Sequence, residues 1–201
     1  MKMLENGFFY NVYDIGDNLV LKKKRSFLDI LTNTKLKNIS LVLKQHKVAK
    51  SQTLLIKKKL SVLPASLLGN PRFINSYNYK QDKVELLYEY FENHSIEENK
   101  TIIKKYLELV VELLKYGIHD YTYKFKNSYG VTPQNDVVFI DFNEITASKD
   151  EVLKLVDSRH WLIEAQYTKF PEGELKYFIR DAFDSKLNKA VVEGLWAKNI
   201  I

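Results

Sequence analysis

The sequence predicts an α+β fold with two lobes, an antiparallel sheet in the first lobe and mainly helices in the second. Short strand-like runs that flank turns fill residues 1–92, whereas a long amphipathic helix pattern opens residues 93–201. The charge is divided in a similar way. Residues 21–60 hold twelve Lys or Arg and one acid, a net charge of +11, and the remainder carries −5. We therefore expect two lobes with different electrostatic tasks.

The composition excludes several classes of protein. The chain has 201 residues, of which 45% are hydrophobic and 13% aromatic, enough for one sizeable core or two small ones that share a cleft. It has no cysteine, which excludes disulfides, thiolate metal sites and thiol nucleophiles. Because neither a secretory leader nor a membrane-spanning run is recognisable, we expect a cytoplasmic protein, either in its own cell or in a host cytosol.

The first part of the chain predicts a hairpin followed by helix. Residues 8–13 and 19–23 resemble strands, and the turn at residues 14–18 contains Gly and Asn, which tolerate positive φ. Leu and Ile then recur at spacings of three to five over residues 35–63. This pattern predicts one long or two short amphipathic helices, which end at Pro64.

A second hairpin is predicted from residues 72–79 and 84–90, with its turn at residues 81–83. The polar residues 92–95 then form a linker between the lobes. Ser95 and Glu98 have the spacing of a capping box, so a helix should begin there.

The second lobe should contain that helix, one buried hairpin and further helices. The capped helix carries apolar residues on one face and ends at Gly117. Residues 128–131 and 137–140 predict a hairpin with a turn at 132–136. Two or three helices are expected from about residue 149 to the end.

Four short motifs follow one another along the chain, at residues 19–22, 86–92 and 124–127 and at Asp141-Phe142-Asn143. They resemble motifs of the protein-kinase-like superfamily, particularly those of small atypical bacterial kinases and of the antibiotic and lipopolysaccharide-core kinases. Residues 19–22 resemble the strand that carries the ATP-binding lysine, and residues 86–92 resemble the hinge between the lobes. A Lys-x-x-Asn sequence at residues 124–127 resembles the catalytic loop. Asp141-Phe142-Asn143 resembles the Asp-Phe-Gly metal motif.

This resemblance implies ATP and Mg²⁺ as cofactors, and a two-lobed minimal kinase-like fold that transfers the γ-phosphoryl group to a protein or sugar hydroxyl. Asp120 would orient or accept the hydroxyl proton. The other implied roles fall to Lys124 in catalysis, to Gly7, Lys22, Glu89 and Phe91 in nucleotide binding, and to Asn127 and Asp141 as metal ligands.

The chain departs from the kinase pattern in three respects. The candidate phosphate loop, residues 7–13, has a single glycine. The helix acid that usually pairs with the lysine is missing, with Gln45 and Gln52 as polar stand-ins. Asp120 lies seven residues before Asn127, where the pattern has five.

Alternatives stay open for the residues and for the function. The residue five before Asn127 is Thr122, so either the loop is longer or Thr122 stands in the base's place. Lys22 could be a solvated surface lysine, and Asp141 could cap a turn. The whole chain could be a pseudokinase that binds a nucleotide or partner, or a nucleic-acid-binding protein that uses the basic segment. The basic face at residues 35–59 is also expected to recruit an acidic partner.

Overall fold

The computed structural model of the chain describes residues 1–33, 39–123, 128–162 and 173–199. Its first part is built on a five-stranded antiparallel sheet with the strand order β1-β2-β3-β5-β4. The strands are β1 (Lys2–Asn6), β2 (Tyr10–Gly16), β3 (Leu19–Lys24), β4 (Arg72–Phe73) and β5 (Tyr79–Asp82). The predicted first hairpin is confirmed as β2 and β3, whereas β1 was missed because all five of its residues are exposed and give no burial pattern.

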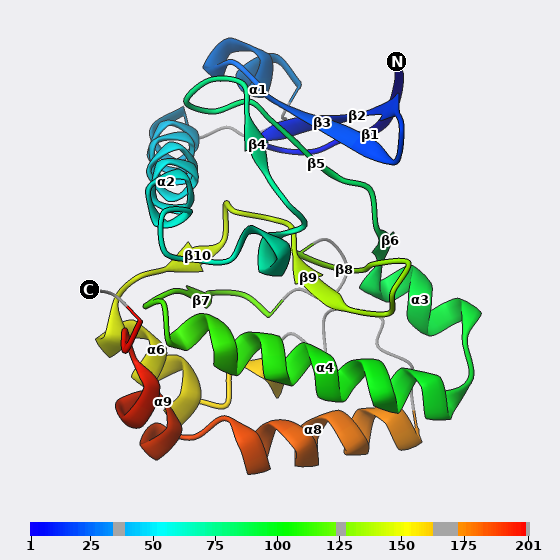
Figure 1. The fold of residues 1–201 in the computed structure, drawn as a ribbon. Helices are drawn as coiled ribbons and strands as arrows, with labels where there is room; N and C mark the ends of the chain where they lie inside the picture. Colours follow the sequence, from blue (N-terminus) through cyan, green and yellow to red (C-terminus); the bar gives the residue numbers. More distant parts are fainter. Residues whose placement is uncertain (34–38, 124–127, 163–172, 200–201) are drawn as a thin grey trace.

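Two helices and a 3₁₀ turn lie in the chain between β3 and β4. They are α1 (Phe27–Asn33), α2 (Ile39–Lys59) and a single 3₁₀ turn, η1 (Ala65–Leu68). Figure 1 shows α1 above the sheet and α2 to its left. The helix predicted within residues 35–63 is confirmed as α2, although residues 34–38 lie outside the described part of the chain. The buried face of α2 is not the leucine-rich one, because Ile39, Leu43 and Leu54 are exposed.

The buried face of α2 includes two polar residues, His46 and Thr53. The hydroxyls of Thr53 and Tyr10 are hydrogen-bonded at 2.9 Å, and Nε2 of His46 lies 3.4 Å from the carbonyl of Arg25. Because these partners satisfy the polar groups, the face can be buried without being uniformly apolar. A pattern of apolar residues alone therefore points to the wrong side of this helix.

The second part of the chain contains two small sheets and a set of helices. One sheet has the order β6-β8-β9, and β7 pairs with β10. These strands are β6 (Glu85–Leu86), β7 (His119–Asp120), β8 (Tyr129–Val131), β9 (Val137–Phe139) and β10 (Ile145–Thr146). The helices are α3 (Leu87–Asn93), α4 (Ile96–Leu114), α6 (Lys149–Asp157), α8 (Glu174–Lys186) and α9 (Lys189–Leu195).

Most predictions for this second part are confirmed. Ser95 and Glu98 form the capping box at the start of α4, and Gly117 has a φ of +63° just beyond its end. The β8–β9 hairpin pairs Tyr129 with Phe139. Figure 1 shows α4 and α8 side by side beneath the sheets. The fold is thus α+β, with an antiparallel sheet first and mainly helices after it.

The predicted second hairpin is wrong in its details. Its strands are β4 and β5, and its turn lies at residues 74–78, where Oδ1 of Asn75 accepts hydrogen bonds from the backbone N–H groups of Tyr77 and Asn78. The expected strand at residues 84–90 is limited to β6, after which the chain becomes α3. Leu87, Tyr90 and Phe91 are the buried residues of that helix. These residues stand at positions i, i+3 and i+4, which lie on one face of an α-helix. Burial of that face against the core favours the helix over a strand.

Aromatic contacts link the two parts of the chain through one hydrophobic cluster. The ring of Tyr79 in β5 stacks on that of Phe142 at 5.1 Å between centroids, with an interplanar angle of 17°. Further ring contacts extend in both directions, through Tyr10, Phe139, Tyr129, Tyr106 and Phe183. The division at residues 92 and 93 stays a prediction, because the core is continuous across it.

Residues 83–86 join the sheet of the first part to α3, and Gly130 determines how closely they approach β8. A Cβ at Gly130 would lie 2.2 Å from Cγ2 of Val84 and 3.0 Å from the carbonyl oxygen of Glu85. Leu86 pairs with Gly130 in the sheet register. The connecting segment therefore packs against bare backbone, which only glycine provides.

We expect Gly130→Ala to destabilise the fold by about 1–3 kcal/mol, because the added methyl overpacks this contact. Gly194→Ala in α9 is the matched control, since a Cβ there meets nothing within 4 Å. The control should stabilise the fold by about 0.5–1 kcal/mol, as expected for an open helical site. Urea unfolding measures both, and equal effects of the two substitutions would contradict this account of Gly130.

Candidate functional site

Lys22 lies where the two parts of the chain meet. It extends from β3, is 8% exposed, and its Nζ donates a hydrogen bond of 2.6 Å to the carbonyl of Ile140. Burial lowers the pKa of Lys22, and the charges of Asp141 and Glu5 oppose this effect. Lys22 is therefore not a solvated surface lysine, and its ammonium lies at the end of the strand that leads into Asp141.

Asp141 begins a tight turn directly after the β8–β9 hairpin. Its Oδ1 accepts hydrogen bonds from the backbone N–H and the side-chain Nδ2 of Asn143, at 3.1 and 2.8 Å. The amide oxygen of Asn143 is buried and has no hydrogen-bond partner among the described residues. Asp141 thus does cap a turn, and the same turn gathers carboxylate and amide oxygens, the ligands that Mg²⁺ prefers.

The helix α2 contributes a neutral residue where the kinase pattern has an acid. Nε2 of Gln52 donates a hydrogen bond of 2.6 Å to the carbonyl of Ile145, in the segment after Asp141. At the end of α2, Nζ of Lys59 donates a hydrogen bond of 2.6 Å to the carbonyl of Tyr116. Lys22 forms no ion pair within the described residues, so its charge is not neutralised by α2.

Gly7 begins the turn between β1 and β2, and a Cβ there would lie 2.8 Å from the carbonyl oxygen of Tyr10. Arg25, which sequence reasoning did not single out, holds this turn. Its Nη1 donates to the carbonyl of Gly7 and its Nη2 to that of Asp29, both at 2.9 Å. Arg25 is 6% exposed, but in the sequence it follows three lysines and looks like one more surface charge.

Asp120 lies in β7 and is 1% exposed. Its Oδ2 accepts a hydrogen bond of 2.8 Å from the hydroxyl of Tyr129, and its Oδ1 accepts one of 2.8 Å from the backbone N–H of Thr122. The hydroxyl of Thr122 lies 3.2 Å from Oδ1 of Asp120 and 2.8 Å from Oε2 of Glu144. Thr122 thus connects an interior carboxylate with a half-buried one.

Burial raises the pKa of Asp120 to about 7, and the charge of Glu144 adds to the rise, whereas the hydrogen bonds from Thr122 and Tyr129 lower it. The neighbouring His119 behaves in the opposite way, since burial lowers its pKa to about 3. His119 is hydrogen-bonded through Nε2 to the hydroxyl of Tyr123. Burial thus favours the neutral form of both side chains, so His119 is neutral near pH 7 and Asp120 changes its charge close to that pH.

Glu89 and Phe91, predicted to lie on an extended hinge, lie instead within α3. Glu89 is exposed and Phe91 is 7% exposed. The extended connection between the two parts is residues 83–86, one step earlier in the chain. Lys124 and Asn127 lie outside the described residues, so the structure does not place them.

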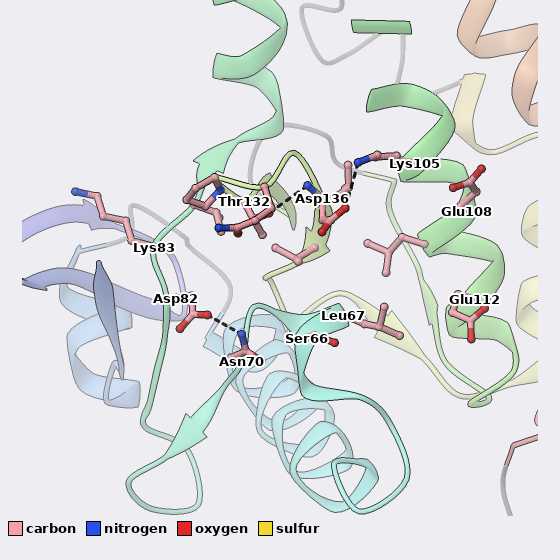
Figure 2. A pocket seen from close by; sticks show the side chains of 16 residues that line it. Ser66, Leu67, Asn70, Asp82, Lys83, Lys105, Glu108, Glu112, Thr132 and Asp136 are labelled. Atoms are coloured by element: carbon pink, nitrogen blue, oxygen red, sulfur yellow. Dashed lines mark hydrogen bonds and ion pairs between the residues drawn. The ribbon is translucent and has the colours of Figure 1, made fainter. Parts of the chain in front are cut away.

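A pocket of about 490 Å³ is lined by residues other than Lys22, Asp120 and Asp141. Figure 2 shows it between η1, the connecting segment near Lys83, α4 and the β8–β9 turn. Its charged groups are paired, as in the hydrogen bond from Asn70 to Asp82 and the ion pair of Lys105 with Asp136. None of the residues predicted to bind nucleotide or metal lines it.

The basic residues of α2 divide into two groups. Lys57 lies over the ring of Phe73, and Lys59 reaches the carbonyl of Tyr116, so both contact other parts of the fold. Lys44, Lys47 and Lys58 are exposed. The acidic partner expected for this face stays a prediction.

Within the described residues, no group of three His, Cys, Asp or Glu gathers as a metal site, and no helix has the length and hydropathy needed to cross a membrane.

Comparison with known proteins gives matches only at the level of structure. No family model and no curated protein matches the sequence. A structure of WbdD with the kinase inhibitor LY294002 superposes with a TM-score of 0.57 at 13% identity, over 90% of this chain and 44% of that one. A second WbdD structure gives a TM-score of 0.54 at 15% identity, over the same shares of the two chains. This chain thus matches less than half the length of WbdD.

The fold is kinase-like. Its sheet, connecting segment and β8–β9 hairpin place Lys22 and Asp141 beside each other, as the order of motifs in the sequence predicted. The identity to WbdD is low, so the likeness concerns the fold and not the chemistry.

We expect Asp120→Asn to change the pH dependence of stability. Because the pKa of Asp120 is raised to about 7 in the folded state, its contribution to stability is lost as pH rises from about 4 to about 7. Asparagine does not titrate, so the unfolding free energy of the variant minus that of the wild type should increase over this range and level off above it.

Urea unfolding at several pH values between about 4 and 8 measures this difference. His119 contributes the opposite slope, because its pKa is lowered to about 3, but it is present in both proteins and cancels in the comparison. A difference that is independent of pH would show that Asp120 is ionised in the folded protein throughout.

Proposed function

We propose that this protein is an ATP-dependent phosphotransferase that uses Mg²⁺ and transfers the γ-phosphoryl group of ATP to a hydroxyl on a protein or a sugar. The observation that carries this proposal is the position of Lys22. A buried ammonium that forms no ion pair with any described residue lies beside the turn that begins at Asp141, so a cation and oxygen ligands converge at one place. Phosphoryl transfer depends mainly on such positioning and charge stabilisation.

The proposed nucleotide contacts follow from the fold. Lys22 would bind phosphate oxygens, and the turn at Gly7, held by Arg25, would cover them. The adenine would meet backbone groups of residues 83–86 rather than Glu89 or Phe91, because the backbone of α3 is engaged in helical hydrogen bonds. A kinase inhibitor was crystallised with WbdD, whose fold this chain resembles, and this favours a nucleotide-binding role for the fold by analogy.

Asp141, together with Asn127, would hold Mg²⁺. The unpartnered amide oxygen of Asn143 beside Asp141 fits an oxygen-ligated cation. The ion would neutralise charge that develops on the transferred phosphoryl group. Lys124 would contact the same group. The chain would thereby supply lysine cations for the phosphate oxygens and a carboxylate for the metal ion at one site.

Asp120 would orient or accept the proton of the acceptor hydroxyl, and the backbone N–H of Thr122 would help to hold its carboxylate in place. Its own oxygens face the Tyr129 hydroxyl and the Thr122 backbone, whereas the Thr122 side chain also contacts the half-buried Glu144.

The second candidate function is that of a pseudokinase, a protein that binds ATP without turnover. It is favoured by the absence of an acid on the described face of α2 and by the burial of Asp120.

ATP with Mg²⁺ should stabilise the wild-type protein, by about 2.7 kcal/mol at a concentration 100 times its Kd. Lys22→Met should abolish most of this effect, because the phosphates lose a cation. Lys23→Met is the matched control, since Lys23 is an exposed neighbour on the other face of β3. Thermal unfolding with and without nucleotide measures the effect. No shift of the wild type at millimolar ATP, with calorimetry in agreement, would remove the kinase proposal.

Asp141→Asn should distinguish the binding of Mg²⁺ from the binding of the nucleotide. The neutral amide retains the side-chain shape and a hydrogen bond with Asn143, but it loses the charge that attracts Mg²⁺. We expect ATP alone to bind at least as tightly as to the wild type, whereas the gain in affinity from Mg²⁺ should be lost. If Mg²⁺ strengthens ATP binding equally in both proteins, Asp141 is not a metal ligand.

Asp120→Asn should lower kcat by at least about a hundredfold while the Kd for ATP changes little. Thr122→Ala should cost less, because its backbone N–H still holds Asp120. Incubation with γ-labelled ATP and candidate acceptors measures turnover. A mild effect of Asp120→Asn beside a severe effect of Thr122→Ala would reassign the role to Thr122 and Glu144. Nucleotide binding without any turnover in the wild type would favour the pseudokinase.

A further inference from the structure

Lys24 is a second lysine with a buried ammonium group, and no role has yet been assigned to it. Its Nζ is shielded from solvent and has no hydrogen-bond partner among the described residues. Two aromatic rings face it, since the ammonium lies 4.7 Å from the ring centroid of Phe9 and 4.8 Å from that of Tyr10. The backbone N–H of Lys24 donates to Oδ1 of Asn78, which fixes this end of β3.

The position of Lys24 in the sheet places it near the turn that begins at Gly7. Lys24 lies two positions after Lys22, so both side chains extend from the same face of β3. In the register of the sheet, Lys22 pairs with Val12 and Lys24 pairs with Tyr10, the first residue of β2 after that turn. Lys24 therefore lies closer than Lys22 to the turn proposed to cover the phosphates.

The charges around Lys24 do not neutralise it. Lys50 and His46 of α2 lie within electrostatic range of it, as does Asp141, whose charge also acts on Lys22. Lys24 makes no ion pair in the described part of the chain. Aromatic faces offset only part of the cost of removing an ammonium from water. A buried lysine in this setting is more costly to the empty protein than an apolar side chain of the same length.

We propose that Lys24 is a second phosphate-binding cation, which contacts the terminal phosphates of a nucleoside triphosphate together with Lys22. This inference rests on the proposed function and identifies the part of the ligand that the β1–β2 turn covers. It also accounts for the missing acid on α2, because a carboxylate beside these lysines would compete with the phosphates for them.

The ionisation of Lys24 is consistent with this role. Burial lowers its pKa to about 8, the charge of Lys50 lowers it further, and that of Asp141 raises it. A bound polyphosphate would favour the charged form. Binding of ATP above about pH 8 should therefore be accompanied by proton uptake, which calorimetry in buffers of different ionisation enthalpy detects.

The test compares the affinities of Lys24→Met, Lys24→Arg and Lys23→Met for ATP and for adenosine. Lys24→Met should weaken ATP binding about 10–100-fold, the size expected for one charge-assisted contact, and should leave adenosine binding unchanged. Lys24→Arg should restore part of the loss. Lys23→Met should bind both ligands like the wild type, because Lys23 is exposed. Without nucleotide, Lys24→Met should unfold at a temperature no lower than the wild type, which verifies that the variant folds.

The outcomes separate this inference from the proposed function. If Lys24→Met binds ATP as tightly as the wild type while Lys22→Met does not, Lys24 has no part in phosphate binding and the kinase proposal stands. If Lys24→Met weakens ATP and adenosine equally, Lys24 supports the fold of the site and the inference is wrong. If the wild type binds no ATP, both proposals fall.

Discussion

The stack of Tyr79 on Phe142 is the contact on which the arrangement of the site depends. Tyr79 belongs to the sheet of the first part and Phe142 follows Asp141 in the second, so the stack fixes one part against the other. The ammonium of Lys22 lies 5.9 Å from the centre of the Tyr79 ring. A single buried aromatic contact thus positions both the lysine and the turn of Asp141. Because both rings are almost fully buried, the lysine is held in a dry setting that strengthens its charge interactions.

The fold was predictable from the sequence wherever a pattern had a local cause. The capping box at Ser95, the hairpin that pairs Tyr129 with Phe139 and the β2–β3 turn each follow from residues a few positions apart. Errors arose where tertiary contacts decide. The strand β1 has only exposed residues, and the buried face of α2 depends on hydrogen bonds that polar side chains make to distant partners. Asn75 is a residue that favours turns, and the observed turn lies at residues 74–78. The polar residues 81–83 resemble a turn equally well in the sequence, so the turn was predicted there.

The candidate site was predictable in outline and not in its details. Lys22 and Asp141 were identified by their order along the chain, and the structure brings them together. Arg25 and Lys24 were hidden because a run of four basic residues looks like a solvated surface. Strand alternation is the signal that separates them, since Lys22 and Lys24 share one face of β3 and Lys23 has the other. The inward orientation of the Asp120 carboxylate depends on Tyr129, nine residues away, which no local pattern reports.

The anchoring of α2 has a mechanical consequence. Gln52 binds the carbonyl of Ile145, and Lys59 binds the carbonyl of Tyr116 at the end of α4, so two points on one helix are tied to the second part of the chain. A rotation of α2 away from the second part would break both hydrogen bonds and leave two carbonyl groups without those partners. The helix α2 is therefore expected to keep its position relative to the second part of the chain. A movement of the β1–β2 turn, in contrast, would break neither of these hydrogen bonds. That turn is held to the remainder of the first part by the guanidinium group of Arg25 and by the hydrogen bond of 2.9 Å from the backbone N–H of Arg25 to the carbonyl of Phe9.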